Sequence, residues 1–127
     1  MRRSDQRRDA VFALYQRKVT GRPLAELLAD ARLFTRELAE GTEAAAPELD
    51  AEIAALARGW SLDRIAPLEL SIMRVALYEM RTREDVPVEV AIDEAVNLAQ
   101  EFCGADAPDF VNGILGAAAR KLQETAP

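Results

Sequence analysis

The sequence contains no histidine and only one cysteine among its 127 residues. Without histidine, the chain lacks the commonest metal ligand and a frequent general base. Cys103 has no second cysteine with which to form an internal disulfide. We interpret it as structural, because it lies near the expected end of a helix, where the helix dipole raises a thiol pKa. No nucleophile paired with a base, metal site or phosphate loop is evident, so we expect a protein that is not an enzyme and has no cofactor.

Long apolar runs are also absent. No segment approaches the roughly 18 apolar residues of a membrane-spanning helix, and the arginine-rich start lacks the apolar stretch of a secretory signal peptide. We therefore expect a cytoplasmic protein. The length suits one domain, residues 1–127, that buries a core of its own.

The net charge of −6 conceals an uneven distribution along the chain. Residues 1–18 carry a local charge of +4, which leaves −10 for residues 19–127. The basic residues of this first segment are Arg2, Arg3, Arg7, Arg8, Arg17 and Lys18, interrupted by Asp5 and Asp9. A basic arm on an acidic body indicates a local anion-binding site, although a solvated helix end with scattered arginines would carry the same charges.

Apolar residues recur at helical spacing, and no segment alternates in the manner of a half-buried strand. Prolines and glycines separate the helical segments. We predict helices from Ser4 or Asp5 to about Lys18, from Leu24 to about Ala29, from about Arg32, after Pro47, over 67–81, over 88–102, and after Pro108. The predicted fold class is therefore all-α, a bundle of about seven helices.

Three features refine this prediction. The segment 67–81 is apolar around most of its circumference, which is typical of a central helix covered on several sides. Trp60 closes the apolar stripe of the helix that begins near Pro47, and we expect it to anchor the core. Gly41 weakens the helix prediction for the segment that contains it.

Four motifs together resemble the NusB family of bacterial transcription antitermination factors. They are, in order, RRDAVFALYQ, WSLDRIAPLELSIMRVALYEM, DVPVEVAIDEAVNLAQEF and APDFVNGIL. The resemblance spans nearly the whole chain and is weakest over 21–49. It implies two packed helical sub-bundles. It also implies a protein that, with the ribosomal protein NusE, binds the boxA element of nascent ribosomal RNA and helps RNA polymerase to read through terminators.

The resemblance also implies a set of site residues. Those expected to bind RNA are Arg2, Arg3, Arg7, Arg8, Tyr15, Phe102 and Asp106, and those expected on the NusE side are Glu69 and Asp106. Unpaired RNA offers phosphates to arginine, base faces to aromatic rings and amino groups to carboxylates, so these residue types are chemically apt. Tyr15 has a second interpretation, as a half-buried core tyrosine.

Two departures from the family pattern stand out. The arm is interrupted by acidic residues, which weakens its field, and Asp93 occupies a position where the family usually has asparagine. An alternative function is a helical protein-interaction module without RNA binding. Such a module could form a homodimer, and a homodimer could cover the arginine arm.

Overall fold

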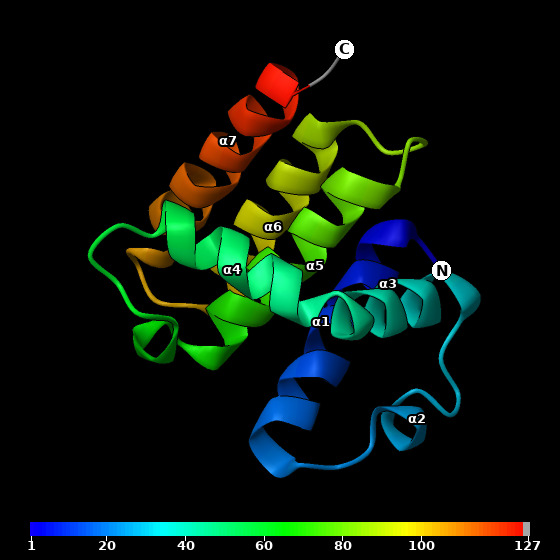
Figure 1. Cartoon of the computed structure of the whole chain (residues 1–127). Coiled ribbons are helices and arrows are strands. Elements are labelled where there is room, and N and C mark those ends of the chain that lie inside the picture. The colour runs from blue at the N-terminus through cyan, green and yellow to red at the C-terminus, as the bar shows by residue number, and fades with distance from the viewer. Residues whose placement is uncertain (126–127) are drawn as a thin grey trace.

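The computed structural model describes residues 1–125, which form seven α-helices and one short 3₁₀ helix (Figure 1). This part of the chain contains no strand, so the all-α prediction is confirmed. The elements are α1 (Arg3–Thr20), α2 (Leu24–Leu27), α3 (Leu33–Ala44), α4 (Ala46–Leu56), η1 (Leu62–Arg64), α5 (Pro67–Thr82), α6 (Val88–Phe102) and α7 (Ala107–Thr125).

The helices form two groups that share α5. Helix α1 packs against α2 and α3, whereas α4, α6 and α7 pack around α5 (Figure 1). Because α5 also contacts α1 and α3, it joins the two groups and is covered on several sides. Its buried residues are Leu70, Ser71, Ile72, Met73, Val75, Ala76, Leu77, Glu79 and Met80. The prediction of a central helix over 67–81 is therefore confirmed.

Local sequence accounts for the main helix boundaries. Helix α1 ends where Gly21 adopts a left-handed φ of 74° and donates its backbone N–H to the carbonyl of Arg17, a conformation that glycine adopts without steric cost. Pro67 occupies the first position of α5, and Pro87 immediately precedes α6. Proline suits both positions because its φ is fixed and it has no N–H to leave unpaired. Across residues 1–125, none of the helices has the length and apolar character needed to cross a membrane.

The expectation that Trp60 anchors the core is wrong. Its side chain is 53% exposed, because α4 ends at Leu56 and the chain then turns through Gly59, whose φ is 81°. The apolar periodicity continues in the sequence beyond the point at which the helix ends. Leu49 and Ile53 supply the buried contacts of α4.

Gly41 lies within α3, where the ring of Tyr78 on α5 packs directly against its backbone. A Cβ at this position would overlap the aromatic ring of Tyr78. The residue that weakened the helix prediction therefore permits the close approach of α3 and α5.

We predict that Gly41→Ala lowers the free energy of unfolding by about 1–3 kcal/mol, the usual cost of overpacking a core. Gly113→Ala is the matched control, because a Cβ there meets no atom within 4 Å and helix propensity favours alanine. Urea denaturation followed by far-ultraviolet circular dichroism would measure both variants. Equal stability of Gly41→Ala and the wild type would contradict the prediction.

Candidate nucleic-acid interface

Arg7 lies in the interior, although it belongs to the basic arm in the sequence. Its side chain is 6% exposed and that of Glu79, on α5, is 1% exposed. Arg7 Nε donates to both carboxylate oxygens of Glu79 at 2.8 and 2.9 Å, and Nη2 donates to Oε2 at 2.7 Å. Glu94 on α6 lies 3.8 Å from Nη1. The pair therefore ties α1 to α5 and brings α6 into the same cluster.

The charge state of Arg7 is secure in this environment. Burial by itself would lower its pKa, but the hydrogen bonds and negative charge of Glu79, helped by Glu94, more than offset that effect and raise the pKa above its usual value. The expected phosphate contact of Arg7 would require this pair to break. The structure instead gives Arg7 a place in the packing of the bundle.

The remaining arm arginines lie at the surface, and each is near a carboxylate. Arg2 lies 3.6 Å from Asp5, and Arg8 lies 3.5 Å from Asp5 and 3.6 Å from Asp9. Exposed pairs of this kind contribute little to stability and exchange readily with other partners. The arm can therefore present positive charge, but its own aspartates partly neutralise it.

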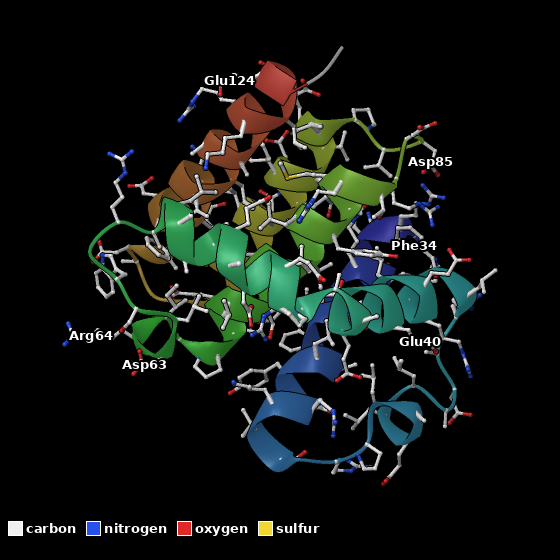
Figure 2. All side chains as sticks on the ribbon, viewed as in Figure 1. Phe34, Glu40, Asp63, Arg64, Asp85 and Glu124 are labelled. Carbon is white, nitrogen blue, oxygen red and sulfur yellow. The ribbon has the colours of Figure 1, made fainter. Side chains whose placement is uncertain are left out.

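Arg3 joins a second cluster at the turn between α5 and α6. Its guanidinium lies 4.5 Å from the centre of the Phe34 ring and 3.0 Å from Asp85. Phe34 and Asp85 are both labelled in Figure 2. Hydrogen bonds from Arg83 and from Arg3 lower the pKa of Asp85 to about 2, so its carboxylate is charged at neutral pH. Arg3 is thus the most firmly held of the exposed arm arginines.

The arm faces α6 across a shallow cavity of about 290 Å³. Arg2 and Arg8 line one side, and Leu98 and Glu101 line the other. Phe102 follows at the end of α6. It is 40% exposed, and its ring contacts that of Phe12 edge to face, with centroids 4.9 Å apart.

A second cavity, of about 300 Å³, brings Glu69 and Asp106 together. Burial raises the pKa of Glu69, and the nearby Cys103 thiol has a raised pKa because of its own burial and the Glu69 charge. The cavity is also lined by Trp60 and Phe110, whose ring centroids are 6.0 Å apart, and by Arg64.

We refer to the surface from this cavity through Phe102 to the arginine arm as the α6 strip. It includes Arg2, Arg8, Phe102, Glu69 and Asp106 of the predicted site residues, whereas Arg3 and Tyr15 line neither of its two cavities. Tyr15 is partly buried on α1, one helical turn beyond Phe12.

Sequence reasoning missed Trp60, Arg64 and Phe110 as members of the strip. Arg64 extends outward from the loop between α4 and α5 (Figure 2). For Trp60 and Arg64 the signal was present in the aromatic and basic residues of the WSLDR motif, and for Phe110 it was present in the APDFVNGIL motif. It was misread because the tryptophan was assigned to the core.

The family model of the NusB family matches residues 4–120 of this chain. The chain belongs to the NusB family of transcription antitermination proteins. The transcription antitermination protein NusB of Rubrobacter xylanophilus is 40% identical over 129 residues, which covers 96% of this chain and 93% of that relative. Matches to two further relatives with this name cover only 46% and 59% of their lengths.

Solved structures agree with this assignment. NusB from T. maritima has a TM-score of 0.87 and 28% identity, over 100% of this chain and 94% of that one. A NusB chain solved with NusE and dsRNA has a TM-score of 0.81 and covers 94% of this chain and 96% of its own, but its identity of 22% supports the fold alone. The resemblance to NusB is thus confirmed. Membership in this family of antitermination factors also bears out the expectation of a protein that is not an enzyme.

We predict that Arg7→Met lowers the free energy of unfolding by about 3–5 kcal/mol, because it leaves Glu79 buried without its partner. The double variant Arg7→Met/Glu79→Leu should recover most of this loss, since it removes both charges. Arg8→Gln, at the surface, is the control and should change stability by about 0.5 kcal/mol or less. Urea denaturation of the four proteins tests the pair, and a double variant no more stable than Arg7→Met would contradict it.

Proposed function

We propose that this chain is an RNA-binding adaptor that, together with NusE, binds the boxA element of nascent ribosomal RNA. In this role it helps RNA polymerase, within an antitermination complex, to read through terminators. The observation that carries the proposal is the α6 strip. Along it, exposed arginines, an exposed phenylalanine and a cavity lined by carboxylates and aromatic rings succeed one another.

The chemistry of the strip suits an unpaired RNA segment. Arg2, Arg3 and Arg8 would contact phosphates, and Phe102 offers an exposed ring on which a base can stack. At the far end, Asp106 would accept hydrogen bonds from base amino groups or from the protein partner. The aromatic and acidic residues would thus recognise the RNA bases, while the arginines would position the RNA backbone.

The acidic body supports the pairing with NusE. Residues 19–127 carry a net charge of −10, and ribosomal proteins are commonly basic. Charge complementarity of this kind raises the rate and specificity of association more than its affinity. We place NusE at the cavity that contains Glu69 and Asp106, where Trp60 supplies an exposed apolar surface. A related NusB chain has been solved with NusE and RNA.

A binding titration tests the proposal directly. Labelled boxA RNA should bind this protein more tightly when NusE is added, and a scrambled RNA of equal length should bind less well under the same conditions. With three arginines on phosphates, the slope of log affinity against log salt should be about −2, from roughly −0.7 per phosphate for single strands. Equal binding of boxA and scrambled RNA in the presence of NusE would defeat the proposal.

The aspartates that partly neutralise the arginine arm give a second prediction. Asp5→Asn should strengthen RNA binding by about 1.5- to 5-fold at low salt, because exposed ion pairs are worth roughly 0.2–1 kcal/mol and Asp5 lies near both Arg2 and Arg8. Glu48→Gln is the matched control, since it removes the same charge from the first turn of α4. If both variants bind RNA equally well, the arm aspartates have no local effect.

The alternative is a protein-interaction or homodimeric module without RNA binding. The exposed Trp60 and its neighbour Phe110 favour some apolar partner at this position. Light scattering distinguishes the two cases. A dimer that dissociates when Trp60 is replaced by serine, together with no RNA binding in the titration above, would support the alternative.

A further inference from the structure

Arg3 is the exposed arm arginine that reaches the turn between α5 and α6. Its Nη1 atom lies 3.0 Å from Asp85 Oδ2, and both side chains are about half exposed. Arg2 and Arg8, by contrast, lie near carboxylates of α1 itself. The charge of Arg3 is therefore engaged by a residue that is distant in sequence and fixed by another part of the bundle.

Asp85 is shared between two guanidinium groups. Arg83 Nε donates to Asp85 Oδ1 and Arg83 Nη2 donates to Asp85 Oδ2, each at 3.1 Å. The oxygen Oδ2 thus faces Arg3 and Arg83 at once. If Arg3 turned away, Asp85 would keep both hydrogen bonds from Arg83, so the departure of Arg3 would leave no carboxylate unpaired.

Arg83 is held in place by a second carboxylate. Its Nη1 atom donates to Glu37 Oε2 on α3 at 2.8 Å, and its side chain is 22% exposed. Hydrogen bonds to Asp85 and Glu37 raise the pKa of Arg83 above its usual value, so it stays charged. Arg83 can therefore neutralise Asp85 by itself, whether or not Arg3 is present.

Phe34 supplies a contact for Arg3 that does not depend on Asp85. The centre of its ring lies 4.5 Å from the guanidinium carbon of Arg3 and 5.2 Å from that of Arg83. A guanidinium above an aromatic ring is attracted through its face, while its N–H edge stays available to an acceptor with two oxygens. Arg3 can thus change its acceptor while it remains over Phe34.

We propose that Asp85 competes with an RNA phosphate for Arg3, and that Arg83 permits the exchange because it neutralises Asp85 when Arg3 leaves. This inference rests on the proposed RNA-binding function. A carboxylate and a phosphate offer similar pairs of oxygens to a guanidinium, so one can replace the other. Asp85 and Arg83 are positioning residues that act on RNA binding through Arg3.

Two substitutions should change RNA affinity in opposite directions in the titration with labelled boxA RNA and NusE. Asp85→Asn releases Arg3 and should strengthen binding about 1.5- to 5-fold at low salt, the range for one exposed ion pair. Arg83→Gln leaves Asp85 to Arg3 alone and should weaken binding by a similar factor. A purely structural role would weaken binding in both variants, and that result overturns the proposal.

Glu84→Gln and Arg81→Gln are the matched controls, because they remove the same charges from exposed residues beside the cluster. Each effect should exceed that of its control, and equal effects would mean that only net charge matters. In an Arg3→Gln background, Asp85→Asn should have no more effect than its control. An undiminished effect in that background contradicts the proposal, and this comparison decides the matter if Arg83→Gln fails to fold.

Amide chemical shifts follow the exchange at the turn itself. In the complex with NusE, boxA RNA should shift the amides of Asp85 and Phe34 in the wild type but not in Arg3→Gln. RNA binding without these shifts, or equal binding by all variants, defeats this inference alone. A wild type that binds no boxA RNA defeats the proposed function, and this inference with it.

Discussion

The buried pair of Arg7 and Glu79 is the interaction on which the arrangement of the bundle depends. Two opposite charges in an apolar interior are tolerated only when they meet with good hydrogen-bond geometry, and here Glu79 accepts three hydrogen bonds from Arg7. Glu94 lies beside the pair and accepts a hydrogen bond from Ser4 at 2.7 Å. The register of α1 against α5 and α6 is therefore set by polar contacts that tolerate little displacement.

This anchoring explains how a short arm comes to lie beside another helix. Because the pair holds the first turns of α1 beside α6, Arg2 and Arg8 come to line a cavity with Leu98 and Glu101. Arg2, Arg3 and Arg8 then lie at the surface, whereas Arg7 from the same arm is buried. Within one stretch of sequence, arginine thus has a role in packing and, under the proposed function, a second role in binding RNA.

The charge pattern suits an adaptor that acts with a partner. Carboxylates lie beside each exposed arginine of the arm, so the isolated protein presents a weakened positive field. Acidic residues such as Glu69 and Asp106 lie at the other end of the α6 strip, in a cavity with exposed aromatic rings. A basic partner placed there would offset the negative charge near the RNA and would contribute contacts that the arm lacks. Under the proposed function, this distribution of charge favours RNA binding together with a basic partner over binding by the isolated protein.

The sequence by itself determined the helices, the central position of 67–81 and the family, because helical periodicity, prolines and short motifs are local properties of the chain. Tertiary structure decided where particular side chains lie. Arg7 is buried because Glu79, distant in sequence, meets it, and Trp60 is exposed because the chain turns at Gly59. The cavity that unites Glu69 with Asp106 exists only because α5 packs against α7. Composition and spacing record none of these contacts, since each depends on how separate helices pack in space.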